Sequence, residues 1–149
     1  MTSLLTLVVL ALALVSTQVE AGSKSIHVTA EIVQQTFTGK IANPEIGDQL
    51  ISSVDLFDKN DDKVGTGTGV CTVISVPEPP EPEDTLIQCL LTAVFDQGQI
   101  IFGGSAQFPE VDAVGRFGIL GGTDRFQKAR GEATLTVLSP DTQDAVIEI

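Results

Sequence analysis

The chain has 149 residues, a length that suits one domain. Its 8 Lys and Arg residues against 20 Asp and Glu residues give a net charge of −12 at pH 7. This charge argues against nucleic-acid binding, which needs a basic face that displaces counterions. There are seven Phe but no Tyr and no Trp, which excludes tyrosine acid–base chemistry and weakens the case for a surface on which bases stack.

The N-terminal residues have the pattern of a secretory signal peptide. Leu4–Val15 is apolar except for Thr6, and at about 1.5 Å per residue it is too short to cross a bilayer as a helix. A polar stretch follows, and Val19-Glu20-Ala21 fits the small-residue rule for signal peptidase. We predict that residues 1–21 are cleaved, which leaves residues 22–149 as a secreted domain without membrane association. No Lys or Arg precedes the apolar stretch, so a membrane anchor or a buried strand is the alternative.

The two cysteines flank a segment rich in proline and glutamate. Cys71 and Cys89 are centred on residue 80, inside the run at 77–84. If residues 69–76 and 85–95 form a hairpin, the cysteines oppose each other at the short Cα separation that a disulfide needs. Because an exported chain meets an oxidising compartment, we predict a Cys71–Cys89 disulfide, with two free buried thiols as the alternative. One His and two Cys make a zinc site improbable, and no metal is expected.

Apolar residues recur with a period of two along nearly the whole chain. In the first segment Ile26, Val28, Ala30 and Ile32 alternate with less apolar neighbours, which predicts a strand with one apolar face. Strands are predicted at residues 26–33, 48–57, 64–76, 85–95, 100–106, 113–120, 131–138 and 145–149. No long helical pattern appears. We therefore predict an all-β fold, and the pattern is typical of an antiparallel sandwich or barrel. A closed, eight-stranded antiparallel, calycin-like β-barrel would leave no exposed strand edges and would have room inside for one small ligand.

Few residues offer catalytic chemistry. Glu31 lies on the face opposite the apolar set of its strand. If Glu31 points inward, desolvation raises its pKa and makes it a candidate proton donor or acceptor; if it points outward, it is an ordinary solvated carboxylate. Four of the eight basic residues cluster at Arg116, Arg125, Lys128 and Arg130, where they either pair with acids or meet an anionic ligand. Asp58, Asn60 and Asp62 begin like a calcium loop but lack its glycine and its final glutamate, which indicates a solvated turn.

Two stretches resemble known families. Gly47–Leu50, Leu56–Asp58, Val64–Cys71 and Phe95–Ile100 look like the allene oxide cyclase barrel. Gly121–Gly131, with its Gly-Gly, Phe and Ala-Arg-Gly at fixed offsets, resembles the signature of plant dirigent proteins. The resemblance implies an eight-stranded antiparallel barrel, often trimeric, without a cofactor. It also implies an apolar lumen that orients a reactive hydrophobic molecule during ring closure or coupling.

The resemblance also suggests site residues. Glu31 takes the place of the cyclase's catalytic glutamate, and Cys71 that of its lumen cysteine. Val33, Val54 and Ser105 fall at the pocket positions of two asparagines and a tyrosine. The expected function is a secreted barrel that binds a small hydrophobic metabolite and steers its cyclisation or coupling, as an isomerase if it is an enzyme, and that associates as a trimer or dimer. The alternative is a non-catalytic extracellular binding or structural protein on the same barrel.

Overall fold

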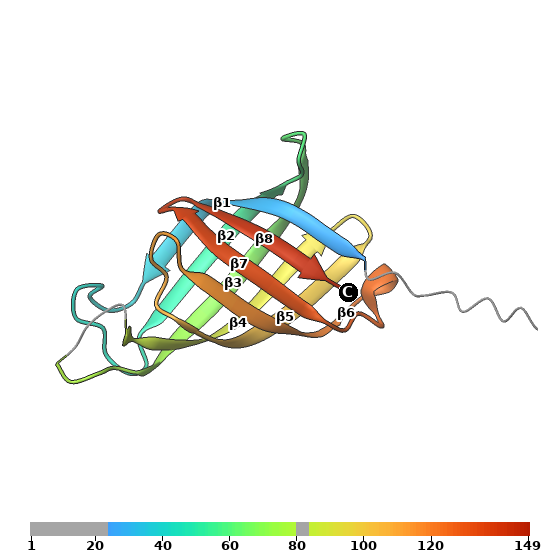
Figure 1. Cartoon of the computed structure of the whole chain (residues 1–149). Helices are drawn as coiled ribbons and strands as arrows, with labels where there is room; N and C mark the ends of the chain where they lie inside the picture. Colours follow the sequence, from blue (N-terminus) through green and yellow to red (C-terminus); the bar gives the residue numbers. More distant parts are fainter. Residues whose placement is uncertain (1–23, 80–83) are drawn as a thin grey trace, which may run out of the picture.

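The computed structural model describes residues 24–79 and 84–149, and these form a closed barrel (Figure 1). Its elements are β1 (Ser25–Phe37), β2 (Gln49–Phe57), β3 (Lys63–Ser75), β4 (Leu86–Phe95), β5 (Gly98–Gln107), β6 (Val114–Gly122), the 3-10 helix η2 (Asp124–Phe126), β7 (Glu132–Ser139) and β8 (Thr142–Glu148). The predicted signal peptide and part of the proline-rich segment lie outside the described residues. Within those residues no helix is long and apolar enough to span a membrane.

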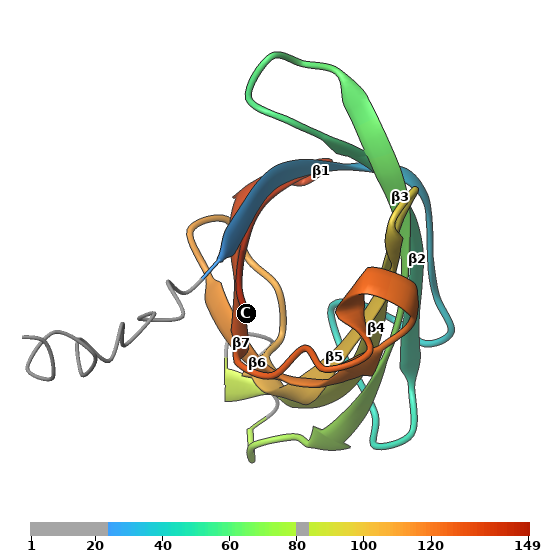
Figure 2. The same cartoon turned by 90° about the vertical axis from the view of Figure 1, so that its right-hand side faces the viewer.

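Each strand pairs antiparallel with the next, and β8 returns to β1, which confirms the predicted eight-stranded antiparallel barrel. The closing ladder runs from Ser25 opposite Glu148 to Glu31 opposite Thr142. Figure 2 looks along the barrel and shows the ring of strands. Every strand therefore has two neighbours and the sheet has no free edge strand, although the β5–β6 ladder is limited to Ile100–Gly103 of β5 and Gly118–Gly122 of β6.

A β-bulge in β1 changes which side chains face the lumen, the space inside the barrel. Ala30 pairs with Leu56 of β2 in regular register, but the register shifts between Ile32 and Gln34. After the shift Gln35 lies opposite Ser52 and Phe37 opposite Leu50. A bulge adds one residue to one strand, so inward positions change from even to odd numbers. The extra residue, Val33, is 64% exposed.

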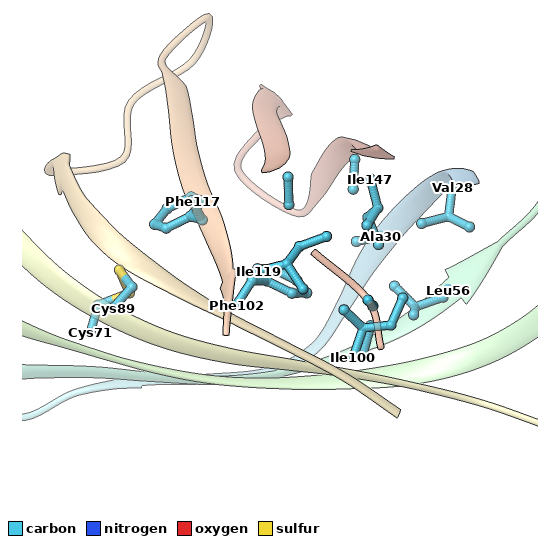
Figure 3. Packing of buried hydrophobic residues seen from close by; sticks show 14 of the residues in the cluster. Val28, Ala30, Leu56, Cys71, Cys89, Ile100, Phe102, Phe117, Ile119 and Ile147 are labelled. Carbon is cyan, nitrogen blue, oxygen red and sulfur yellow. A yellow bond between two sulfur atoms is a disulfide. The ribbon is translucent and has the colours of Figure 1, made fainter. Parts of the chain in front are cut away.

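The two ends of the barrel differ. At one end η2 and the turns after β2 and β4 come together, and η2 covers part of this end in Figure 2. Phe126 of η2 is buried there beside Phe95, with ring centroids 6.0 Å apart. Figure 3 shows Val28, Leu56, Ile100 and Ile147 packed together, and the last two are almost fully buried. We call this the closed end.

The opposite end, which we call the mouth, is formed by the described residues that connect the strands there: 38–48, 76–79, 84–85, 108–113 and 140–141 (Figure 1). The rings of Phe37 and Phe108 meet there edge to face, 5.5 Å apart. Figure 3 shows Phe117 and the Cys71–Cys89 pair on the side of the cluster away from Val28 and Leu56. The core extends to both ends, because Val73 and Thr85 near the mouth are also almost fully buried.

Candidate functional site

The lumen contains two adjoining cavities of about 60 Å³ and 90 Å³. The deep chamber, nearer the closed end, is lined by residues that include Val28, Leu56, Ala93, Phe102 and Ile147. The outer chamber, nearer the mouth, is lined by residues that include Cys71, Ala106, Pro109, Val114 and Phe117. Ser52, Leu91, Leu135 and Gln143 line both chambers. Since a cavity needs a volume of roughly 10–15 Å³ to hold one water molecule, each chamber can hold more than one.

Two glycines of β3 help to keep this space open. A Cβ at Gly67 would lie 2.8 Å from Val54 Cγ2, and a Cβ at Gly69 would lie 2.5 Å from Leu91 Cδ2. Real side chains do not pack so closely, so Val54 and Leu91 occupy space that a larger residue on β3 would take. Small residues on one wall thus accommodate large ones from neighbouring strands without filling the centre of the lumen.

Six polar residues line the chambers: Gln35, Ser52, Thr68, Thr92, Gln107 and Gln143. Three of them, Gln35, Ser52 and Gln143, occupy inward positions of their strands. Gln35 and Ser52 are opposed across β1 and β2, and Gln143 on β8 lies opposite Ala30 of β1. Among the described residues, the polar side-chain atoms of these three form no hydrogen bond with the protein. None of these atoms is buried without a partner either, so they remain accessible to a small molecule. Such groups can donate to or accept from a ligand without first breaking a protein hydrogen bond.

Within residues 24–79 and 84–149, no charged side chain lines either chamber. Asp58, which lies in the turn between β2 and β3 at the closed end, has a pKa below its ordinary value. The backbone N–H groups of Asn60 and Asp62 donate to Asp58 Oδ1 at 2.8 Å and 3.1 Å. These bonds favour the carboxylate and lower the pKa of Asp58. Asp58 is thus bonded within its own turn, and none of the described residues that line the lumen is an acid or a base.

Glu31 lies on the outer surface of the barrel. Of the two orientations that the sequence left open, the structure therefore shows the outward one. Its neighbour Ala30 is only 3% exposed and faces inward, whereas Glu31 is exposed. Its cross-strand partners are Asp55 on β2 and Thr142 on β8. The physical reason is alternation: β1 turns its even-numbered residues inward up to the bulge. A ligand in the lumen is out of reach of this carboxylate.

Two of the other expected pocket residues line the lumen and two do not. Val54 and Cys71 belong to the deep and outer chambers. Val33, in contrast, is the exposed bulge residue. Ser105 is also exposed and donates a 2.9 Å hydrogen bond to Gln88 Oε1 on the outer surface. Val33 points outward because it is the extra residue of the bulge in β1. Ser105 points outward because side chains alternate along β5, where Phe102 and Ala106 face inward.

The disulfide prediction is confirmed. Cys71 and Cys89 are directly opposed on β3 and β4, with Cα atoms 4.0 Å apart, and their sulfur atoms are bonded. Both residues are buried, and both line the outer chamber. The bond therefore ties two neighbouring strands of the lumen wall together.

The clustered cations do not surround the lumen. Arg116 Nη1 lies 3.9 Å from Glu132 Oε1 on the outer surface. Arg125, Lys128 and Arg130 are exposed residues on η2 and the segment that follows it, at the closed end. Arg130 donates to the carbonyl oxygen of Ala129 at 2.7 Å. No described cation lines a chamber, so the lumen lacks a partner for an anionic ligand.

The profile of the allene oxide cyclase barrel-like domain matches residues 24–148. This chain belongs to that family. Among solved structures, the barrel of this family member is similar to a pyocyanin demethylase, with 25% identity, a TM-score of 0.69, and coverage of 85% of this chain and 100% of the other. It is also similar to an exo-specific intermolecular Diels-Alderase, with 16% identity, a TM-score of 0.71, and coverage of 85% and 96%. A pterocarpan synthase dirigent protein shares 15% identity at a TM-score of 0.60, over 85% of this chain and 87% of that one.

The last two similarities show a shared fold alone, because their sequence identities are low. No curated protein matches this allene oxide cyclase barrel-like chain. The resemblance noted in the sequence is therefore confirmed at the level of family and barrel. The polar residues of the lumen were missed in the sequence, although Ser52 has the same parity on β2 as Leu50, Val54 and Leu56.

Proposed function

We propose that this protein binds a small hydrophobic molecule in its lumen and steers the geometry of its cyclisation or coupling. The observation that carries the proposal is the pair of adjoining, uncharged chambers whose walls are mostly carbon. Their apolar surface favours an apolar guest, which is removed from water when it binds. Solved structures with the same barrel include a demethylase, a Diels-Alderase and a dirigent protein, all named for reactions or products of organic molecules.

The proposed chemistry depends on position rather than on acid–base groups. Holding reacting carbons in a near-attack geometry removes much of the entropic barrier of ring closure or coupling. A water-poor, carbon-lined chamber also protects a reactive intermediate from hydrolysis. Ser52 and Gln143 can orient one polar group of the guest, because both face the two chambers. The reaction that fits this lumen is an isomerisation or coupling whose reactive groups belong to the substrate.

We also propose that the protein is secreted and acts free of a membrane. Two observations support this. The N-terminal sequence has the apolar stretch and the small-residue cleavage pattern of a signal peptide. The Cys71–Cys89 disulfide suits an oxidising compartment outside the cytoplasm. Mass spectrometry of the protein from a culture medium tests the proposal, because a mature chain that begins after Ala21 is expected and an intact N-terminus would contradict it.

We further propose that two or three copies associate through the outer wall of β2–β5. Ile51, Val70 and Leu90 form a row of direct cross-strand partners that continues to Gly103, and Leu120 packs over Gly103. All four apolar side chains are 40–60% exposed. The neighbouring outward residues are uncharged: Gln49, Ser53, Thr68, Thr72, Gln88, Thr92, Ile101 and Ser105. Because two strongly acidic chains repel each other, a second copy fits best on this uncharged wall.

A non-catalytic binding protein is the second candidate. It is favoured by the absence of any titratable side chain among the described residues that line the lumen. Such a barrel would bind its guest without changing it. Both functions require that the lumen binds the guest, but only the first converts the guest into a product.

Paired variants of adjacent residues test the proposed function. Ala106 faces the outer chamber and Ser105 faces outward, so Ala106→Leu narrows the lumen whereas Ser105→Leu does not. We expect the wild-type protein and Ser105→Leu to bind the neutral fluorophore N-phenyl-1-naphthylamine, and Ala106→Leu to bind it weakly. No binding to the wild type would overturn the proposal. Catalysis is tested with a diene–dienophile pair that reacts slowly in water. The wild-type protein and Ser105→Leu should give an excess of one stereoisomer, and Ala106→Leu should not. A racemic product from the wild type would favour the non-catalytic binding protein.

A further inference from the structure

The position of the polar residues in the lumen indicates which kind of guest the barrel binds. We propose that the lumen selects a neutral molecule whose single carbonyl or hydroxyl group is held by Ser52 and Gln143, and that it rejects anions. This inference rests on the proposed function, since it concerns the ligand of the same lumen. It goes beyond that function because it fixes the charge and the polar group of the guest.

Ser52 and Gln143 lie where the two chambers meet, since both residues line both cavities. Above and below them the walls are mostly carbon: Val28, Leu56 and Ile147 in the deep chamber, Ile87 and Phe117 in the outer one. A guest that fills both chambers therefore meets its hydrogen-bonding partners near its middle. This arrangement favours a molecule with apolar parts on either side of one polar group.

The side chains also define what that polar group can be. A glutamine amide and a serine hydroxyl each both donate and accept, so they can serve a ketone, an aldehyde or an alcohol. Within the described part of the chain neither side chain has a protein hydrogen bond to give up. A guest without a polar group would cover these atoms and leave them unsatisfied, which costs free energy. The lumen thus discriminates against pure hydrocarbons.

An ionised guest finds no partner in the lumen. The described residues that line the two chambers are all uncharged. The transfer of a carboxylate from water into an uncharged, apolar site is strongly unfavourable. The same reasoning disfavours a cation, which would also enter without a counter-charge. The uncharged wall of the lumen therefore disfavours charged guests, independently of the charges on the outer surface of the protein.

The mouth adds a second barrier against anions. Its described loops carry Glu45, Asp48, Glu78, Asp84, Glu110, Asp112 and Asp141, and among the described residues of these loops Lys40 is the one cation. Most other described cations lie at the closed end: Lys24, Lys59, Lys63, Arg125, Lys128 and Arg130. An anion that approaches the mouth is repelled, and the repulsion extends over about 8 Å at physiological ionic strength.

Three competitors that share one ring system test the proposal. 2-Acetylnaphthalene has a neutral carbonyl, 2-ethylnaphthalene has none, and 2-naphthoate carries a negative charge at neutral pH. Each is titrated against N-phenyl-1-naphthylamine bound to the full mature protein. We expect 2-naphthoate to displace the fluorophore at least tenfold more weakly than 2-acetylnaphthalene. Equal displacement by both would overturn the exclusion of anions.

Two variants test the hydrogen-bonding partners, with one control on the outer surface. Gln143→Leu and Ser52→Ala should each raise the Kd of 2-acetylnaphthalene on the order of fivefold, as the loss of one hydrogen bond predicts, without raising that of 2-ethylnaphthalene. Gln99→Leu, at an exposed position of β5, should change neither. Unchanged ketone affinity in both lumen variants would overturn this inference alone, because 2-ethylnaphthalene would still bind. Failure of N-phenyl-1-naphthylamine and of both neutral competitors to bind would instead overturn the proposed function.

Discussion

Gly69 of β3 and Leu91 of β4 are direct cross-strand partners, and Leu91 occupies the space that a side chain at residue 69 would need. A Cβ at residue 69 would lie 2.5 Å from Leu91 Cδ2. The contact involves the end of a flexible side chain rather than backbone, so the neighbour can move. Because Leu91 lines both chambers, any such movement changes the shape of the lumen.

We therefore expect Gly69→Ala to weaken ligand binding more than it weakens the fold. Leu91 should turn into the lumen and reduce the space for a guest, with a change in the free energy of unfolding of about 1 kcal/mol or less. Gly118→Ala is the matched control, since its Cβ would face open space with only Gly103 O at 4.0 Å. Fluorophore titration and urea denaturation measure the two effects. Equal binding by both variants would show that Leu91 does not control the lumen.

The Cys71–Cys89 bond should contribute to stability by restricting the unfolded chain. The two residues are 18 positions apart, and closing a loop of this size stabilises a protein by roughly 3 kcal/mol in the chain-entropy estimate. Reduction, or the double variant Cys71→Ala/Cys89→Ala, should lower the urea midpoint accordingly. Wild-type protein in reductant should then match the double variant in oxidising buffer. If reductant leaves the midpoint of the wild type unchanged, the bond has no stabilising role.

Glu31→Gln should leave ligand binding and product geometry unchanged. The carboxylate lies outside the barrel next to Asp55, so its loss removes only a surface charge beside another acid. Relief of that repulsion should change stability by a few tenths of a kcal/mol at most, as for other exposed charges. Gln143→Leu, inside the lumen, is the contrasting variant. A loss of turnover in Glu31→Gln on a genuine substrate would restore the catalytic role that the family resemblance implied.

The barrel could be predicted from the sequence because alternation is visible on almost every strand. Even-numbered apolar residues on β1 and β2 identify the inward face directly. The first strand was predicted to end at Val33, but it continues to Phe37, because the bulge breaks the alternation that defines a strand in a sequence. Residues beyond a bulge change face, so Gln35 could not be assigned to the lumen. For Ser105 the family resemblance predicts a pocket position, whereas the alternation of side chains along β5 places it on the outer face.

Asp58 should make the turn between β2 and β3 sensitive to acid. Its pKa in the folded protein is lowered from the ordinary value of 3.8, mainly by the backbone N–H groups of Asn60 and Asp62. A depressed pKa means that the turn is stabilised above the ordinary pKa and that this contribution is lost as the pH falls through the folded value. Amide hydrogen exchange of Asn60 and Asp62 should therefore lose protection below about pH 4. Asp58→Asn should show no such transition, and the same transition in that variant would rule out Asp58 as its origin.

Leu90→Glu should prevent self-association. Leu90 is 56% exposed at the centre of the uncharged outer wall, between Val70 and Gly103. A carboxylate there would be buried without a partner between two copies, which is strongly unfavourable. Leu138→Glu is the control, because Leu138 is similarly exposed, at 50%, but lies on β7 outside this wall. Sedimentation velocity should give a dimer or trimer for the wild type and for Leu138→Glu, and a monomer for Leu90→Glu. A monomeric wild type, or an oligomer that persists in Leu90→Glu, would show that the outer wall of β2–β5 is not the interface.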